Sequence, residues 1–217
     1  MPTGTPFRPR LEILPPSQQR LWQELAEIPP EFVLYGDTAL ALRLGHRQSV
    51  DFDFFSQSRF QPGLLTGRLT LLQRATITQQ APDTLSVLVD RDGPVKLSFF
   101  GIPSLARLKA PDIAADNGLR IASLLDLAGT KASVVQQRAE AKDYLDIDAI
   151  LAEGSVDLAA MLMAAQAIFG EQFNPLVTLK ALSFFGDGDL HLLSPETRRR
   201  LTEAVRSIDP SAFGPGA

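Results

Sequence analysis

The segment from residue 32 to 55 is the part of the chain that most constrains its fold. It reads FVLYGDTALALRLGHRQSVDFDFF. The apolar run FVLY ends at Gly36 and predicts a buried strand. The helical pattern that follows Thr38 stops at Gly45, and residues 50–55 predict a second strand. The segment therefore predicts two strands joined by a glycine turn and a short helix.

Further strands are predicted in the first half of the chain. Their patterns cover residues 75–80, 84–89 and 95–100. The last two flank Asp-Arg-Asp-Gly, a tight-hairpin signal. Helices are predicted between Pro15 and Pro30, where prolines mark both ends, and over residues 62–73. The first ten residues are rich in Pro and polar groups, and we expect them to lie over the surface.

The second half of the chain has a helical pattern. Candidate helices cover residues 123–138, 142–152, 157–168, 175–184 and 195–207. Asp157 and Ser194 are suitable N-caps, and Gly170 is a natural stop. Residues 119–121 predict one short strand. The sequence thus predicts an α+β fold, in which a mixed sheet with flanking helices covers residues 1–105 and a mainly helical region covers residues 106–217.

Composition excludes several kinds of site. The chain has no cysteine and only two histidines, which excludes disulfides and leaves little for a zinc site or a His-based triad. No stretch approaches the roughly 20 apolar residues of a membrane span, and the N-terminus lacks a signal-peptide run, so we expect a cytoplasmic protein with no membrane partner. The net charge is −4, so any contact with RNA requires a local basic patch.

Asp51 and Asp53 stand inside the apolar run VDFDFF. Because alternate side chains of a strand point to one face, both carboxylates project together and the phenylalanines face the other way. Two carboxylates about 7 Å apart along a strand repel each other unless a cation lies between them. Mg²⁺ or Mn²⁺ prefers oxygen ligands and suits phosphate chemistry. The alternative is an edge strand whose polar face happens to carry Asp-x-Asp.

The glycine turn at Gly36 and the pair Asp51 and Asp53 together resemble the first signature of the nucleotidyltransferase superfamily, in which a glycine turn is followed by Asp-x-Asp. More narrowly, GDTALAL, LGHR and SVDFDFF between residues 36 and 55 resemble the AbiEii/AbiGii toxin family. A second signature of that family is matched by Lys131, Arg138 and KDYLD at 142–146. The resemblance implies a nucleotidyltransferase-like fold and a place in toxin–antitoxin or abortive-infection systems.

The resemblance also implies roles for individual residues. Asp51 and Asp53 would hold Mg²⁺ or Mn²⁺ ions that bridge the phosphates of an NTP. Lys131 would neutralise the phosphates, and Asp143 would complete the site, so we expect the Asp pair to face a cleft shared with Lys131. The implied nucleotide-binding residues are Gly36, Asp37, Thr38, Arg47, Arg138 and Lys142. One continuous helix would place the three basic residues of the second signature within a narrow arc.

Two residues depart from the family pattern. Asp37 stands where Gly or Ser is usual, and a carboxylate there repels phosphate unless it binds metal or points away. Ser98 stands on a later strand where many active members carry an acid, and serine is a poor metal ligand. A nucleotide-binding protein that has lost catalysis is therefore an alternative to the enzyme, and a small-molecule modifier of the antibiotic-adenylylating kind is another. For the enzyme, possible partners are an RNA acceptor such as tRNA and a separately encoded antitoxin.

Three smaller motifs each allow two interpretations. Arg47 binds a phosphate or forms a structural ion pair. The run Arg198 to Arg200 is a solvated helix face or a local RNA contact. The sequence Asp187-Gly-Asp189 is an acidic pair or, more simply, a turn.

Overall fold

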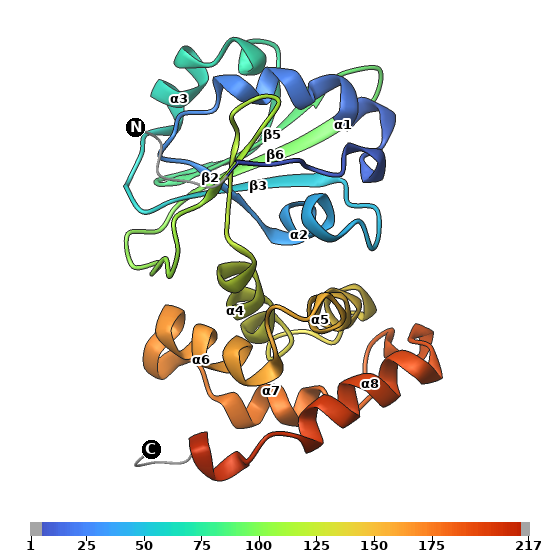
Figure 1. Ribbon diagram of the computed structural model, residues 1–217. Helices are drawn as coiled ribbons and strands as arrows, with labels where there is room; N and C mark the ends of the chain where they lie inside the picture. The colour runs from blue at the N-terminus through green and yellow to red at the C-terminus, as the bar shows by residue number, and fades with distance from the viewer. Residues whose placement is uncertain (1–5, 214–217) are drawn as a thin grey trace. The chain divides into compact units, whose positions relative to one another are not determined.

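The computed structural model describes residues 6–213, and these form two compact units (Figure 1). The first contains residues 6–105 and 109–123, and the second contains residues 106–108 and 124–213. The first unit carries the sheet and the second is helical, which confirms the predicted α+β class.

The sheet of the first unit has eight strands in the order β1-β7-β8-β2-β3-β6-β5-β4. Their bounds are β1 Pro6–Phe7, β2 Val33–Tyr35, β3 Asp51–Ser56, β4 Thr76–Ala81, β5 Thr84–Asp90, β6 Pro94–Gly101, β7 Asp112–Ala114 and β8 Arg120–Ile121. The pairings β1–β7, β8–β2 and β3–β6 are parallel and the others are antiparallel. The sheet is therefore mixed, as predicted, and β3 lies in its middle.

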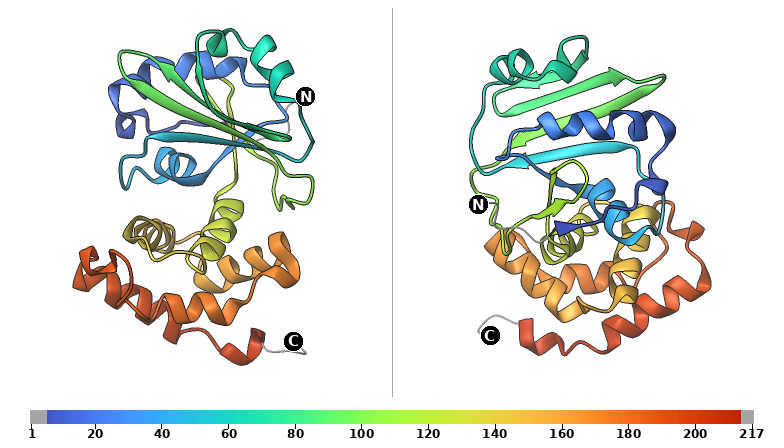
Figure 2. Two further views of the ribbon diagram at one scale, coloured as in Figure 1. Left: turned by 180° about the vertical axis from the view of Figure 1, so that it is seen from behind. Right: turned by 45° about the horizontal axis from the view of Figure 1, so that its top comes forward.

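Helices cover both faces of this sheet. They are α1 Pro16–Leu21, α2 Gly36–Leu44 and α3 Pro62–Arg68, with 3₁₀ turns at Leu11–Ile13, Trp22–Glu27 and Thr70–Leu72. Helices α1 and α3 lie on one face and α2 on the other, as the views of Figures 1 and 2 agree. Every second side chain of β3 therefore points toward the face covered by α2.

The opposite face of β3 belongs to the apolar core. Phe52 and Phe54 are completely buried, and Phe54 stacks on Phe99 of β6 with ring centroids 5.1 Å apart. Trp22 packs against Phe52 at 6.5 Å. Burial of these large rings, each worth about 2–3 kcal/mol, holds the strand in its register. The alternation of VDFDFF therefore leaves Asp51 and Asp53 on the α2 face.

The second unit consists of five helices, as predicted, among the residues that the structure describes. They are α4 Leu124–Val134, α5 Ala141–Glu153, α6 Leu158–Phe169, α7 Pro175–Ala181 and α8 Pro195–Arg206, with 3₁₀ turns at Gly170–Gln172, Leu190–Leu192 and Pro210–Phe213. Asp157 and Ser194 cap α6 and α8 through their side-chain oxygens, as their positions predict. Within residues 6–213, no helix has the length and apolar character needed to cross a bilayer.

The structure differs from the sequence-based prediction in several elements. Strands β1 and β7 were not predicted as strands, because two or three residues are too few to show a period. Residues 109–123 carry β7 and β8 and belong with the first unit instead of the helical region. The predicted helix 62–73 breaks at Leu69, and the predicted helix 123–138 ends at Val134.

Candidate functional site

The turn from β2 into α2 begins at Gly36 and lies directly beside Asp53. Gly36 has a φ of +73°, a conformation that favours glycine. A Cβ at this position would stand 3.2 Å from Oδ2 of Asp53. Both the backbone conformation and the close approach therefore require glycine, and together they bring the start of α2 against the carboxylate.

Thr38 ties the same turn to β3. Its buried hydroxyl donates a short hydrogen bond to the backbone carbonyl of Asp51 and is hydrogen-bonded to the Ser49 hydroxyl at 2.8 Å. The structure thus gives the Thr38 side chain two protein partners. Its role in phosphate contact stays a prediction, and its observed role is to position the acidic strand.

Asp37, which departs from the family pattern, is balanced by a neighbouring cation. Arg47 Nη2 lies 3.0 Å from Asp37 Oδ2, and both side chains are mostly buried. Of the two interpretations offered for Arg47, the structure shows the ion pair. The carboxylate of Asp37 is therefore partly neutralised without a metal.

Two residues of β6 face the acidic pair of β3. The parallel register places Lys96 beside Asp51 and Ser98 beside Asp53. Lys96 Nζ lies 3.7 Å from Asp51 Oδ2, and both side chains are more than two-fifths exposed. Ser98 therefore occupies the strand position at which many active nucleotidyltransferases carry an acid. Lys96 was not predicted as a site residue.

Asp53 is the carboxylate of this face with the least favourable surroundings. Burial raises its pKa, and the nearby charges of Asp51 and Asp37 raise it further. A hydrogen bond with Ser98 and the charge of Lys96 act in the opposite direction and are outweighed. A cation bound at Asp53 would relieve both the burial penalty and the repulsion, which is the electrostatic condition of a divalent-metal ligand.

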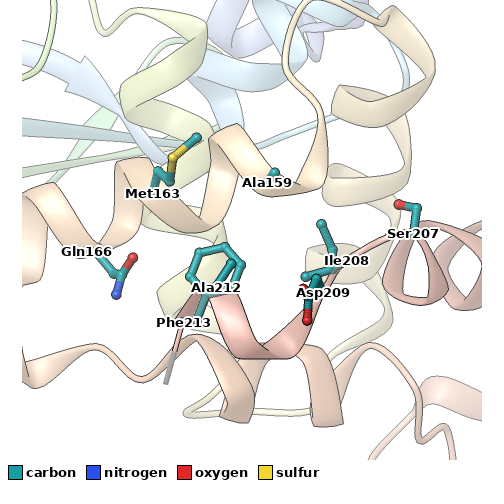
Figure 3. A pocket seen from close by; sticks show the side chains of 8 residues that line it. All are labelled: Ala159, Met163, Gln166, Ser207, Ile208, Asp209, Ala212 and Phe213. Carbon is teal, nitrogen blue, oxygen red and sulfur yellow. The ribbon is translucent and has the colours of Figure 1, made fainter. Parts of the chain in front are cut away.

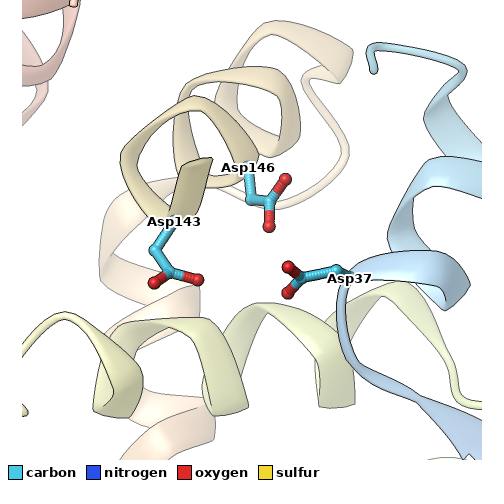
Figure 4. A group of neighbouring side chains, drawn as sticks. All are labelled: Asp37, Asp143 and Asp146. Atoms are coloured by element: carbon cyan, nitrogen blue, oxygen red, sulfur yellow. The ribbon is translucent and has the colours of Figure 1, made fainter. Parts of the chain in front are cut away.

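The second signature forms a cluster in the second unit. Lys131 of α4 reaches two carboxylates of α5, with Nζ 2.7 Å from Asp143 Oδ1 and 2.6 Å from Asp146 Oδ2. The two acids are three residues apart and project from the same side of α5 (Figure 4). Asp146 was part of the quoted motif but not a predicted site residue, although its i, i+3 spacing from Asp143 indicated a shared face.

Arg138 joins this cluster through Asp143. Its Nε and Nη2 lie 2.7 and 3.1 Å from the two carboxylate oxygens, a bidentate contact. The three basic residues do not lie on one helix, because α4 ends at Val134 and α5 begins at Ala141. The intervening loop lets Arg138 turn back to Asp143, whereas Lys142 pairs with Glu140 at 3.1 Å. Lys142 thus shares Glu140 with Arg138, whose Nη1 lies 3.6 Å from Glu140 Oε1.

The Asp187-Gly-Asp189 sequence is a helix-capping turn. Asp189 Oδ1 accepts a hydrogen bond from the backbone N–H of Ala141, the first residue of α5, at 2.6 Å. Gly188 has a φ of +54°, and a Cβ there would stand 2.0 Å from the carbonyl oxygen of Ala139. Of the two interpretations, the structure supports the turn, and this turn fixes the start of the helix that carries Asp143.

The arginine run of α8 is occupied by protein contacts. Arg200 makes a bidentate ion pair with Asp148, which raises its pKa, and Arg199 pairs with Glu203 at 3.1 Å. Arg198 donates to the carbonyls of Leu190 and His191 and lies over a phenylalanine ring. These contacts show the run engaged with the protein's own groups, and an RNA contact stays a prediction.

The sequence matches the family described as "Nucleotidyl transferase AbiEii toxin, Type IV TA system" over residues 20–213. That match spans both units and both signatures. The chain belongs to the AbiEii family. This family is described as a nucleotidyltransferase toxin family of type IV toxin–antitoxin systems. The match confirms the resemblance inferred from the two signatures.

Three other proteins are similar to this chain in sequence or in structure. An uncharacterized protein of Aquifex aeolicus (strain VF5) is 31% identical over 159 residues, which cover 72% of this chain and 75% of that one. The nucleotidyltransferase toxin MenT4 of Mycobacterium tuberculosis H37Rv has a similar structure, with a TM-score of 0.57, 15% identity, and coverage of 90% of this chain and 83% of that one. A protein of H. pylori assigned as a nucleotidyltransferase gives a TM-score of 0.54 at 18% identity, covering 91% and 94%. At these identities the two structures support the nucleotidyltransferase-like fold alone.

Proposed function

We propose that this AbiEii-family protein is a metal-dependent enzyme that transfers a nucleotide from an NTP to an acceptor, and that the acceptor is RNA, such as tRNA. The observation that carries the proposal is the α2 face of β3, where Asp53 meets the glycine turn at Gly36. A nucleotidyltransferase needs carboxylates for metal next to free backbone N–H groups for phosphate. Both are present within one unit of the protein.

The residues of this face fit a hard divalent cation. Asp51 and Asp53 offer carboxylate oxygens from one side of a strand, the donor type that Mg²⁺ and Mn²⁺ prefer. The raised pKa of Asp53 marks a carboxylate whose charge lacks full compensation from the protein. A bound metal ion would supply charge stabilisation for the phosphates of an NTP. We therefore propose Asp51 and Asp53 as metal ligands.

The neighbouring protein groups would prepare the face for a phosphate. The first turn of α2 directs its backbone N–H groups toward the start of the helix, where an anion is favoured. The ion pair with Arg47 reduces the repulsion that Asp37 would otherwise exert on a phosphate. Lys96, beside Asp51, is the second cationic side chain of this face after Arg47, and we propose that it contacts a phosphate oxygen of a bound NTP.

We retain Lys131 and Asp143 as proposed catalytic residues, with Arg138 and Lys142 as proposed nucleotide-binding residues. The support is their match to the second family signature. Lys131 already holds two carboxylates, so a phosphate would have to compete with Asp143 and Asp146 for it. Asp143 in turn orients both Lys131 and Arg138, which makes it the positioning residue of this group.

The proposal is tested by label transfer. Purified protein is incubated with each labelled NTP, total tRNA and Mg²⁺ or Mn²⁺. We expect label on RNA, reduced at least about a hundredfold by Asp53→Asn. Asp92→Asn is the matched control, because Asp92 is an exposed acid of the β5–β6 hairpin in the same unit. Transfer that persists in Asp53→Asn would contradict the assigned metal role.

A binding protein without catalysis is the second candidate, favoured by Ser98 beside Asp53 in place of an acid. For this candidate an NTP with Mn²⁺ raises the melting temperature, because a ligand of the folded state stabilises it, but no label reaches RNA. The variant Ser98→Asp then tests whether the site is inactive only because it lacks one metal ligand. Transfer gained in this variant would show that the serine had removed the activity.

For a partner, we propose an antitoxin encoded separately from this chain. The support is the type IV toxin–antitoxin description of the matched family. Co-expression with candidate neighbouring genes, scored by rescue of growth, tests this proposal. Rescue by none of them would count against it.

A further inference from the structure

A hollow in the second unit combines an aromatic ring with a cation outside the residues discussed so far. It has a volume of about 290 Å³ and lies between the loop after α4, the start of α5, and α7 with its following turn. Among its lining residues are Gln137, Arg138, Tyr144, Lys180, Phe184 and Asp187. We name it the α7 hollow. Its volume is close to the lower limit for small-ligand pockets, which suits one nucleotide unit.

Phe184 presents a large apolar surface at this hollow. Its side chain is 56% exposed, whereas the next residue, Phe185, packs against buried Tyr144 with ring centroids 6.2 Å apart. The backbone N–H of Phe184 donates to the carbonyl of Ala181, so the chain continues to turn after α7. Two adjacent aromatic residues are thus used differently, one for the core and one at the surface.

Lys180 provides the charge. It lies at the end of α7 and lines the same hollow as Phe184. Across residues 6–213, the Lys180 ammonium makes no ion pair or hydrogen bond. Arg138, by contrast, is held by Asp143 and Glu140. An unpaired ammonium beside an exposed ring is the combination that binds a phosphate and a base together.

The remaining groups of the hollow suit the edge of a base or a sugar. Burial raises the pKa of Tyr144 to about 12, so its phenol stays neutral, and its hydroxyl donates to the carbonyl of Ala181 at 3.4 Å. The amide of Gln137 is exposed and can donate or accept. The carboxylate of Asp187 repels a phosphate but accepts hydrogen bonds from a ribose hydroxyl or a base amino group.

We propose that the α7 hollow binds one nucleotide unit, with its base stacked on Phe184 and its phosphate on Lys180. The unit is either a free NTP or one nucleotide of a single-stranded RNA. The choice of ligand rests on the proposed function, whereas the geometry of the hollow does not. A second hollow, between α6 and Pro210–Phe213, has about 470 Å³ and no cationic lining residue, and it provides a control (Figure 3).

Tryptophan fluorescence tests this proposal directly. The chain has a single tryptophan, Trp22, which is buried in the first unit. Phe184→Trp preserves the stacking surface and adds a reporter, and Met163→Trp is the matched control, because Met163 lines the second hollow and is also 56% exposed. Both variants are titrated with ATP, GTP, CTP, UTP and four-nucleotide single-stranded RNAs. We expect quenching in Phe184→Trp and none in Met163→Trp.

The titrations with NTPs and with RNA show whether the hollow binds a free NTP or one nucleotide of an RNA strand. Quenching by NTPs assigns the hollow to a mononucleotide, and quenching by RNA alone assigns it to the acceptor strand. No quenching by any probe, or equal quenching in the Met163 variant, overturns the proposal. In direct binding, Phe184→Ala raises the Kd of the active probe at least about fivefold. Lys180→Gln weakens binding and lowers its salt dependence, and Lys180→Arg retains both.

Failure of this proposal is distinguishable from failure of the proposed function. Asp53 does not line the hollow, so Phe184→Trp must still be quenched after Asp53→Asn is added. Quenching without label transfer supports the hollow and counts against the enzyme. Label transfer without quenching does the reverse.

Discussion

The acidic face of β3 and the Lys131 cluster both combine aspartates with basic residues, but they balance their charges differently. In the second unit, Lys131 and Arg138 stand against Asp143 and Asp146, and each of these carboxylates has a cation within 2.7 Å. On β3 the nearest cations pair with the neighbours of Asp53. Asp53 itself is hydrogen-bonded to Ser98, and the charge of Lys96 does not outweigh its burial and the nearby carboxylates.

This difference separates a self-sufficient cluster from one that needs a ligand. When one partner of a buried ion pair is removed, the other charge stays buried without compensation, and the folded state is destabilised. Charges that lack a partner oppose folding until a cation binds. The same substitution, Asp to Asn, should therefore have opposite effects on stability in the two units.

The largest expected effect is at Asp143. Asp143→Asn removes the carboxylate shared by Lys131 and Arg138. We expect the free energy of unfolding, measured with urea, to fall by about 3 kcal/mol. A change below about 1 kcal/mol would contradict the view that the paired charges of this cluster stabilise the fold.

A smaller loss is expected at Gly36. Gly36→Ala forces an L side chain into a φ of +73° and brings its Cβ to 3.2 Å from Asp53 Oδ2. The expected cost is about 1–3 kcal/mol, together with weaker Mn²⁺ binding in calorimetry because the carboxylate must shift. Gly63→Ala is the control, since a Cβ there meets no atom within 4 Å. Equal stability of the two variants would remove the case for the close approach.

At Asp53 the sign should reverse. Asp53→Asn removes a carboxylate that burial and like charges disfavour, so the fold should be unchanged or slightly stabilised at pH 7, and Mn²⁺ affinity should fall at least about tenfold. Thermal melts and calorimetry measure the two effects. Undiminished Mn²⁺ binding would reject the ligand role.

The pH dependence follows from the same pKa shift. Because the folded pKa of Asp53 is raised, the folded state binds this proton more readily than the unfolded state does. The destabilising contribution is present above the folded pKa and disappears as the pH falls below the unfolded value. The advantage of Asp53→Asn in melting temperature should therefore shrink on acidification. An advantage that grows toward low pH would show that the shift has the other sign.

The smallest effect is expected at Lys142. It shares the second signature and pairs with Glu140, and both side chains are more than two-fifths exposed. Lys142→Ala should change the free energy of unfolding by less than about 0.5 kcal/mol. A loss comparable to that of Asp143→Asn would mean that the signature acts as one unit.

Local patterns predicted much of the first unit. The alternation of VDFDFF placed Asp51 and Asp53 on one face, and the glycine turn at Gly36 was found where the apolar run ends. Lys96 was missed because its place beside Asp51 depends on the parallel register of β3 and β6, whose paired residues lie 45 positions apart in the chain (96 − 51). Such pairing leaves no mark in a local pattern.

In the second unit, the residues of the signature were predicted but not their arrangement. The sequence pattern extends the first helix of this unit to residue 138, because neither proline nor glycine marks the break after Val134. The break is stabilised by tertiary contacts that sequence periodicity does not report, namely the ion pair of Arg138 with Asp143 and the cap that Asp189 gives to α5.

The cap on α5 also bears on how the chain is made. Asp189 lies 48 residues downstream of Ala141, whose N–H it accepts, and Arg200 lies 52 residues downstream of its partner Asp148. During synthesis from the N-terminus, α5 leaves the ribosome well before either contact can form. The β3 face needs only residues up to the end of β6, whereas the helix that carries Asp143 gains its anchors near the end of translation. A nascent chain thus acquires its acidic strand early and finishes its second signature last.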